Sequence, residues 1–292
     1  MNYTLRHTTR YHYSAPVTLC HSEARVLPRK TQHQQCGAST LTISPEPQVQ
    51  AERRDVFGNR VLYFALEDVH QTLDVTVVTP LNTQPLGPLP GSSPAWERVA
   101  DQLSKDSRFD RQLYRLDSPF IRRNDELAAF ARSCFTPGRP LVDAALALNQ
   151  LIYDTFDYDP SFTTLATPLS EVLANRRGVC QDFAHLAIGA LRSVGLAARY
   201  VSGYLETQPP PGQPRLIGAD ASHAWLAAWI PDWGWLALDP TNGTVAGEQH
   251  PVLAWGRDYA DVAPLKGVMN GGGDHPLEGE GGGMPLTDNS AA

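Results

Sequence analysis

Alternation of apolar and polar residues dominates the first part of the chain. Segments rich in Val, Thr, Leu and Tyr are expected to form strands, and they cover residues 4–13, 17–27, 38–44, 60–66 and 72–79. A two-residue period is typical of a strand with one buried face, and the stretch 56–60 is a turn signal. Short strands with frequent turns predict a small antiparallel β-sandwich over residues 1–80.

Two stretches show neither strand nor helix periodicity. Residues 81–95 are rich in Pro and Gly, and proline donates no backbone hydrogen bond, so we expect an extended linker at a domain boundary. Residues 271–292 combine many glycines with few large apolar side chains. Such a segment buries too little surface to offset its ordering entropy, so a poorly ordered tail is expected.

Residues 96–270 change to helical periodicity and then return to strands. Apolar residues recur at three- and four-residue spacing in 141–152 and again in 183–194, which predicts helices with one buried face. Three strands are expected after them, at residues 198–206, 221–230 and 235–238. Helices followed by an antiparallel sheet predict an α+β domain.

Cys180 is expected in the first turn of the second of these helices. Gly178 ends the preceding helix, and the next apolar stripe begins at Phe183. Free N–H groups and the positive end of the dipole at a helix start favour a thiolate, the reactive form of cysteine. Arg176 and Arg177 add positive charge, and Gly178 would let a substrate approach the sulfur.

His223 and Asp239 supply the groups that a cysteine nucleophile needs. Their segments are expected to pair as a hairpin, and both residues are equidistant from position 231, so they would face one another. His223 would then act as the base for Cys180, and Asp239 would orient His223. Each residue alone is more often structural, but the helix start, the hairpin and the order Cys, His, Asp together favour a catalytic triad.

Three motifs around these residues resemble the transglutaminase core: GVCQDFA at 178–184, SHAW at 222–225 and LDPT at 238–241. More closely, the chain resembles the bacterial transglutaminase-like cysteine proteases, through RVLPR at 25–29, DVFGN at 55–59 and GRDYADVAP at 256–264. The resemblance implies a papain-like fold behind an N-terminal β domain and the same three catalytic roles. It also implies a last alternating strand, and residues 279–285 do not alternate.

Further site residues are open to two interpretations each. Tyr158 is a candidate second oxyanion donor beside the Cys180 N–H, or a core aromatic residue. Gln181 and Asp182 are candidate supporting residues next to the nucleophile, and the Asp182 charge alternatively suits a helix N-terminus. Trp225 and Arg177 are candidate groove residues, although a tryptophan on a hairpin is more often packing.

Composition and charge limit the classes of binding partner that we expect. The net charge is −7 with no basic run, which disfavours nucleic acid. The start of the chain lacks a signal-like apolar core, and no stretch is long and apolar enough to cross a membrane, so a cytoplasmic location without membrane contact is expected. The four cysteines are isolated. The Cys20, His21, His33 and Cys36 spacing fits no zinc finger, and no metal or cofactor is predicted.

The function expected from these observations is thiol-dependent hydrolysis of an amide or peptide bond through an acyl-enzyme. The substrate would be a peptide, a protein or a small amide. Two alternatives stay open: a true transglutaminase, which transfers the acyl group to an amine, and a non-catalytic peptide-binding module. The sequence does not indicate the oligomeric state.

Overall fold

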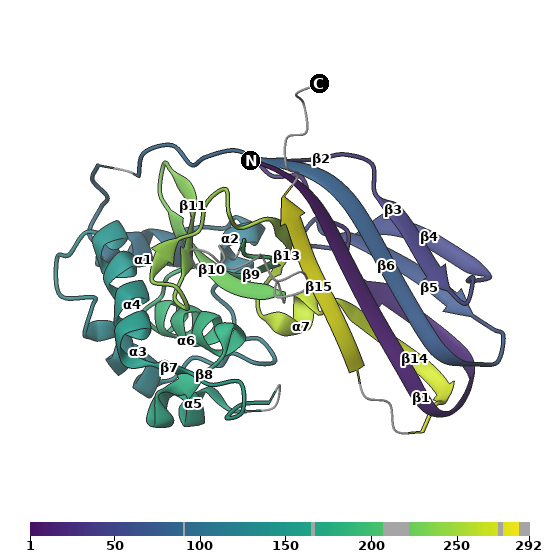
Figure 1. Cartoon of the computed structure of the whole chain (residues 1–292). Helices are drawn as coiled ribbons and strands as arrows, with labels where there is room; N and C mark the ends of the chain where they lie inside the picture. Colours follow the sequence, from purple (N-terminus) through teal and green to yellow (C-terminus); the bar gives the residue numbers. More distant parts are fainter. Residues whose placement is uncertain (90, 165–166, 207–221, 274–276, 286–292) are drawn as a thin grey trace, which may run out of the picture.

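The computed structural model of the chain describes residues 1–89, 91–164, 167–206, 222–273 and 277–285, the last range by its backbone alone. An antiparallel β domain lies beside a unit in which helices pack on a second antiparallel sheet (Figure 1). This α+β arrangement confirms the predicted fold class.

The β domain is organised around one long strand, β1 (Asn2–Ala24). Its first half pairs with β6 (His70–Thr83) and its second half with β5 (Arg60–Leu66), and all three strands belong to one eight-stranded sheet. The two expected strands at 4–13 and 17–27 are thus one strand with a register shift between His12 and Val17. Three shorter strands extend this sheet: β2 (Gln34–Cys36), β3 (Thr40–Ser44) and β4 (Val49–Arg54).

The end of the chain returns to the β domain. Strands β14 (Leu265–Gly271) and β15 (Leu277–Pro285) both pair antiparallel with β1 (Figure 1). Strand β15 lies within residues 271–292, where the sequence predicted a poorly ordered tail. The reason is that backbone hydrogen bonding to an available strand needs no alternating side chains. Residues 274–276 and 286–292 of that tail lie outside the described residues. The β domain is therefore built from both ends of the sequence.

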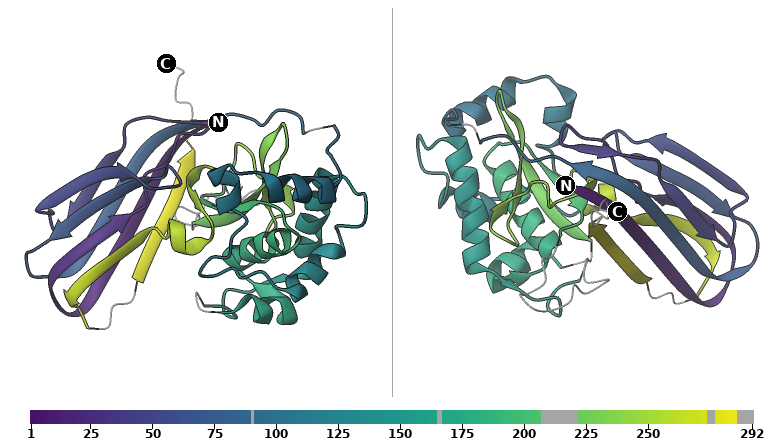
Figure 2. Two further views of the ribbon diagram at one scale, coloured as in Figure 1. Left: turned by 180° about the vertical axis from the view of Figure 1, so that it is seen from behind. Right: turned by 45° about the horizontal axis from the view of Figure 1, so that its top comes forward.

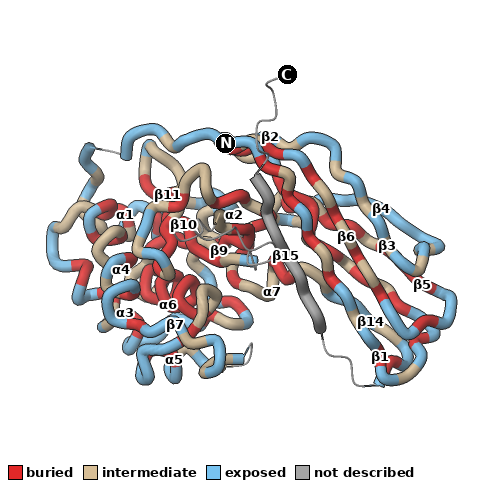
Figure 3. The backbone as a smooth tube through the Cα atoms, in the orientation of Figure 1, coloured by how far each residue is buried: buried red, intermediate tan, exposed pale blue. Residues whose placement is uncertain are grey.

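Helix α6 (Cys180–Ser193) lies at the centre of the second unit, and most of its residues are buried (Figure 3). It contacts α3 (Asp125–Arg132), α4 (Leu141–Thr155) and α5 (Leu169–Asn175). The remaining helices are α1 (Trp96–Lys105), α2 (Phe109–Leu113) and α7 (Tyr259–Val262). Because α6 is surrounded, its first residue is held in a fixed place relative to the sheet.

The second sheet has the strand order β12-β11-β10-β9-β13. Its strands are β9 (Ala198–Gly203), β10 (His223–Ile230), β11 (Gly234–Asp239), β12 (Thr244–Val245) and β13 (Val252–Gly256). Ala224 and Leu226 of β10 belong to the core that contains α6, whereas Trp225 and Ala227 belong to a separate cluster. Alternate residues of β10 therefore face opposite sides of the sheet.

The β domain and the helical unit lie side by side in both views of Figure 2. Two buried amide side chains attach the β domain to the edge strand β13. The Gln34 amide accepts from the Val252 N–H at 2.8 Å and donates to the Val252 carbonyl at 2.7 Å. The Asn59 amide bonds in the same way to Trp255, at 3.0 and 2.8 Å. These amides satisfy backbone groups that an edge strand otherwise leaves unpaired, which explains the Asn at the end of the 55–59 motif.

Candidate active site

The start of α6 presents Cys180 at its first position, as the sequence predicts. The preceding helix α5 ends at Arg176, which is in the left-handed region with φ 54°. Asp182 then accepts a hydrogen bond from the Val179 N–H at 2.9 Å and fixes the turn into α6. A side chain at position 178 would lie 2.9 Å from the Cβ atom of Asp182. Gly178 thus leaves room for the Asp182 side chain. The sequence had suggested a different role, which was to let a substrate approach the sulfur.

Asp182 lies two residues after Cys180 in the first turn of α6. Its side chain is buried, and burial raises the pKa of this carboxyl group despite the hydrogen bond from Val179. A carboxylate in the first turn is favoured by the helix dipole. Cys180 itself is partly exposed, and as the first residue of α6 its N–H has no acceptor within the helix. The thiol therefore lies beside a free backbone donor.

His223 and Asp239 lie together, although in a different register from the one expected. The hairpin pairs Leu226 with Leu238 and Ile230 with Gly234, so residues 223 and 239 are not equidistant from the turn centre. Both are at strand ends, His223 beginning β10 and Asp239 ending β11. A diagonal contact joins them, because the His223 Nε2 is 2.8 Å from the Asp239 Oδ2.

The His223 ring connects the other two predicted triad residues. Burial lowers the pKa of His223, but hydrogen bonds to Asp239 and Cys180, with the charges of both, outweigh burial and raise that pKa to about 9. Since Nε2 is turned to Asp239, Nδ1 is the ring nitrogen left for the thiol. The geometry favours a protonated imidazole between two acidic groups.

Asp239 is fully buried and accepts several hydrogen bonds. Its Oδ1 accepts from the Thr241 and Asn242 N–H groups, at 3.0 and 3.3 Å. Its Oδ2 accepts from the Asn242 side chain at 2.6 Å, besides His223 and a second histidine, His250, at 3.2 Å. Burial raises the pKa of Asp239, but the bonds from His223, His250 and Asn242 outweigh it and hold that pKa well below its usual range.

Sequence reasoning missed Asn242 and His250. Asn242 had a local signal, because an asparagine three residues after Asp239 in a turn can fold back onto it. His250 had none: it lies in the loop between β12 and β13, and only the tertiary fold brings it to the carboxylate. Both residues help to keep Asp239 ionised.

The remaining predicted residues near Cys180 differ in their exposure and in their contacts. Tyr158 is in β7 (Asp157–Tyr158), which pairs with β8 (Arg177–Gly178) directly before Cys180. Its side chain is 57% exposed, which excludes the core interpretation. Burial raises the pKa of Tyr158, and the nearby Cys180 raises it further. Gln181 follows the nucleophile in α6 and is half-buried, and Arg177 is exposed with its guanidinium 3.8 Å from Asp159.

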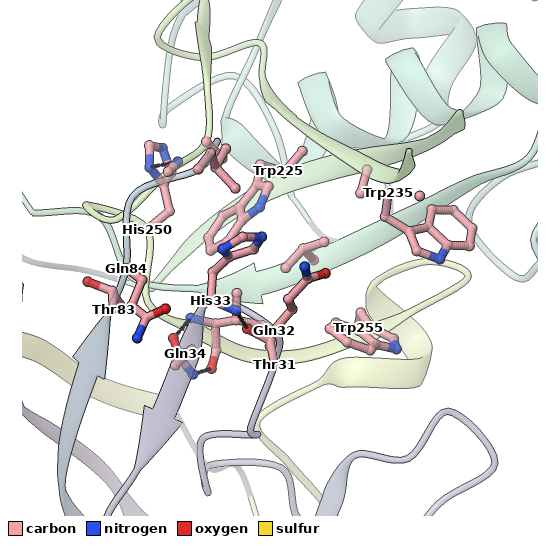
Figure 4. Close-up of a pocket in the computed structure, with 18 of the residues that line it drawn as sticks. Thr31, Gln32, His33, Gln34, Thr83, Gln84, Trp225, Trp235, His250 and Trp255 are labelled. Carbon is pink, nitrogen blue, oxygen red and sulfur yellow. Dashed lines mark hydrogen bonds between the residues drawn. The ribbon is translucent and has the colours of Figure 1, made fainter. Parts of the chain in front are cut away.

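Trp225 lies away from the sulfur, in the wall of a cavity between the sheet and the β domain (Figure 4). This cavity of about 680 Å³ is lined among others by His33, Trp235, His250 and Trp255. Of the described residues, neither Cys180 nor Tyr158 lines it. Trp225 is almost completely buried and packs against the rings of both His223 and His250, at centroid distances of 6.0 and 5.3 Å.

The described residues contain no metal-binding cluster and no disulfide. Among the described residues, no group of three or more His, Cys, Asp or Glu side chains is arranged to hold a metal ion. All four cysteines are free thiols. In the same part of the chain, no helix has both the length and the apolar character needed to cross a membrane.

Two family models match the chain and together cover the β domain and the candidate site. The bacterial transglutaminase-like N-terminal region matches residues 3–80. The transglutaminase-like superfamily core matches residues 128–240, which contain Cys180, His223 and Asp239. The fold and the site thus define a transglutaminase-like protein.

Relatives extend this match to nearly the whole chain. An uncharacterized protein of Mycobacterium tuberculosis is 42% identical over 277 residues, which cover 91% of this chain and 87% of that protein. One of Mycobacterium leprae is 34% identical and covers 93% of this chain and 94% of its own length. The chain belongs to the bacterial transglutaminase-like family.

Two further likenesses are more limited. A crystal structure of a "putative cysteine protease" from Cytophaga hutchinsonii has the same fold, with a TM-score of 0.76 at 20% identity over 100% of this chain and 92% of that one. A protein-glutamine gamma-glutamyltransferase of Pseudomonas aeruginosa is 32% identical over 132 residues, which are 41% of this chain and 20% of that protein.

Proposed function

We propose that this protein is a thiol-dependent hydrolase of amide or peptide bonds, with Cys180 as nucleophile, His223 as acid and base, and Asp239 as the group that orients His223. The observation that carries the proposal is the position of His223, which is hydrogen-bonded to Asp239 and close enough to Cys180, at a helix start, for the thiol to raise its pKa. A transglutaminase-like core around these residues supports it.

In the acylation step, the Cys180 sulfur attacks the carbonyl carbon and a C–S bond forms. The carbonyl oxygen takes the negative charge, which the Cys180 N–H stabilises as an oxyanion donor. The C–N bond then breaks, and the departing nitrogen takes the proton held by His223. Tyr158, beside the sulfur on the exposed β7, is our candidate for the second oxyanion donor.

In the deacylation step, His223 takes a proton from water, and the hydroxyl oxygen attacks the thioester carbon. The C–S bond breaks, the acid is released, and Cys180 returns as a thiolate beside protonated His223. Asp239 stays ionised throughout, because its five hydrogen bonds compensate for its burial. No cofactor enters this cycle.

The substrates that we propose are peptides, proteins or small amides. Arg177 and Gln181 flank Cys180 in sequence and are our candidates for substrate contact, whereas Trp225 packs behind the triad. The cytoplasmic location, and the lack of nucleic-acid and membrane partners, stay predictions from the sequence. Fractionation of the native host with an antibody to the protein checks them.

Acyl transfer to an amine is the second candidate function. Its support is the local likeness to a protein-glutamine gamma-glutamyltransferase, which spans 132 residues. Transfer and hydrolysis share the acylation step and every residue named above. They differ only in whether an amine or water attacks the thioester.

Incubation with Cbz-Gln-Gly, a proteome-derived peptide library and dansylcadaverine separates the two functions. We expect ammonia release or peptide cleavage to exceed dansyl incorporation, and Cys180→Ala to abolish both. Faster dansyl incorporation would establish the transferase instead.

Thiol labelling tests the non-catalytic alternative without any substrate. Iodoacetamide at mildly acidic pH should alkylate Cys180 faster than Cys36, as measured by mass spectrometry. Cys36 is the matched control, because it is also a partly exposed free thiol. Equal alkylation rates would leave the chain as a binding module.

A further inference from the structure

His250 has both ring nitrogens occupied by protein partners. Its Nδ1 accepts a hydrogen bond from the Gly247 N–H at 3.2 Å, and its Nε2 is 3.2 Å from the Asp239 Oδ2. An atom that accepts from an N–H carries no proton, so the ring proton of His250 is on Nε2 and points to the carboxylate. His250 is therefore held as a neutral donor with one defined tautomer.

The oxygen that receives this proton is the one that holds His223. The Asp239 Oδ2 is 2.8 Å from the His223 Nε2, 2.6 Å from the Asn242 amide nitrogen and 3.2 Å from the His250 Nε2. The two backbone donors on Oδ1 come from the turn that follows Asp239. His250 is the donor that lies outside the β10–β11 hairpin, in the loop between β12 and β13. Its hydrogen bond therefore restrains rotation of the carboxylate from a separate segment.

The packing around His250 keeps the ring in place. Only 7% of the residue is exposed, and the Trp225 ring meets it edge-on at a centroid distance of 5.3 Å. Its titratable neighbours are Asp239 and His223, whose ring centroid is 6.3 Å away. His33 lines the same cavity as His250 (Figure 4). Glu248 lies two residues before His250 in the same loop.

Two further charged groups lie near this loop. The Glu206 N–H donates to the Gln249 carbonyl, and the Glu206 side chain accepts from the Tyr3 hydroxyl. The Met1 amino group is 4.0 Å from the Glu248 carboxylate. The polar contacts of the His250 ring are thus directed to Asp239 and to its own loop.

We propose that His250 is a positioning residue of the active site, a neutral imidazole that holds the Asp239 carboxylate in the orientation that binds His223. The proposal deepens the proposed function and rests on it for its catalytic consequence. A neutral donor suits this place, because a second cation on the same oxygen would compete with protonated His223 for the carboxylate. Loss of the donor leaves Asp239 freer to rotate and concentrates its charge on His223.

The test compares three variants with the wild type. His250→Phe removes the donor and keeps a ring, and His250→Gln keeps an N–H donor at a similar reach. His33→Phe is the matched control, since His33 lines the same cavity and has no contact with Asp239 among the hydrogen bonds of the described residues. Thermal unfolding confirms that each variant is folded, and His250→Asn replaces His250→Phe if the latter does not fold.

The first readout needs no catalytic activity. In ¹⁵N-histidine NMR of the wild type at pH 8, His250 should show the Nε2-protonated tautomer. The titration midpoint of His223 should rise in His250→Phe and stay unchanged in His250→Gln and His33→Phe. An Nδ1-protonated His250, or an unchanged His223 midpoint in His250→Phe, would overturn the proposal.

The second readout is catalytic. We expect kcat of His250→Phe to fall about 10- to 100-fold with little change in KM, which is less than the loss of about 10⁴-fold when a triad carboxylate is replaced. Equal kcat in His250→Phe and His33→Phe would refute the positioning role. Failure of the proposed function is recognised separately, by Cys180 and Cys36 reacting equally with iodoacetamide.

Discussion

The two ends of helix α6 are built in opposite ways. At its start, Cys180 is partly exposed, and its N–H has no partner within the helix. At its other end, the Arg192 side chain is almost completely buried. Its guanidinium donates to five oxygen atoms, which belong to Tyr114, Leu116, Ser118, Ala198 and Arg257.

The Arg192 end of α6 contributes to stability, whereas the proposed chemistry takes place at the Cys180 end. Arg192 uses its donors to tie α6 to the chain segment before α3, to β9 and to the loop after β13. A buried guanidinium is costly unless its hydrogen bonds are satisfied, so that end is rigid. At the Cys180 end the first N–H has no acceptor within the helix, and the proposed function uses this group as an oxyanion donor. The rigid end is what holds the open end in position.

The largest effect should come from Cys180→Ala. We expect a loss of activity of at least about 10⁴-fold, because no other group at the helix start can form the thioester. The free energy of unfolding should stay nearly unchanged, because the thiol is only partly buried. Peptide hydrolysis assays and urea unfolding measure the two quantities. A strongly destabilised variant would show that the open end also carries the fold.

Arg192→Met should have the reverse outcome. Five acceptor oxygens would each lose the Arg192 donor, and we expect a loss of about 3 kcal/mol in the free energy of unfolding. Arg132→Met is the matched control, because Arg132 is exposed in the last turn of α3. Urea unfolding measures both. Equal stability of the two variants would contradict the anchoring role.

Gly178→Ala should lower both the activity and the free energy of unfolding. The new methyl group would lie 2.9 Å from the Asp182 side chain, which must move and lose its bond to the Val179 N–H. We expect a cost of about 1–2 kcal/mol and a loss of activity, since Cys180 follows directly. Gly87→Ala is the control, because nothing lies within 4 Å of that site. A fully active Gly178→Ala variant would show that the turn tolerates displacement.

The sequence predicted those parts of the site that depend on local pattern. Gly178 and the stripe from Phe183 place Cys180 at a helix start, and a period of two places His223 and Asp239 on strands. The pairing register was not predictable in the same way. The turn sets it, and Asp232 with a left-handed φ of 60° moves the centre of the hairpin past position 231.

Features that depend on distant contacts left no signal in the pattern. Arg192 looks like any charged residue near a helix C-terminus, yet it contacts residues 65 and 78 positions away. His250 reaches Asp239 only because the loop after β12 returns across the sheet end. Strand β15 lacks alternation, because its pairing with β1 uses the backbone. In each case tertiary structure, not local periodicity, determines the role.

The pH dependence of stability should show the smallest effect and reports on the open end alone. The pKa of His223 is raised to about 9, so its contribution is complete below the unfolded value of 6.5 and is lost as the pH rises through 9.

Wild type and His223→Gln, compared by urea unfolding at several pH values, isolate this contribution from all other groups. The stability difference between them should shrink from pH 6.5 to pH 9, which is the window of the His223 shift. Arg192→Met, introduced into both proteins, should leave the pH dependence of this stability difference unchanged. The reason is that Arg192 donates its hydrogen bonds to residues other than His223 and Asp239. A difference that grows with pH would mean that the folded protein does not hold His223 in its protonated form.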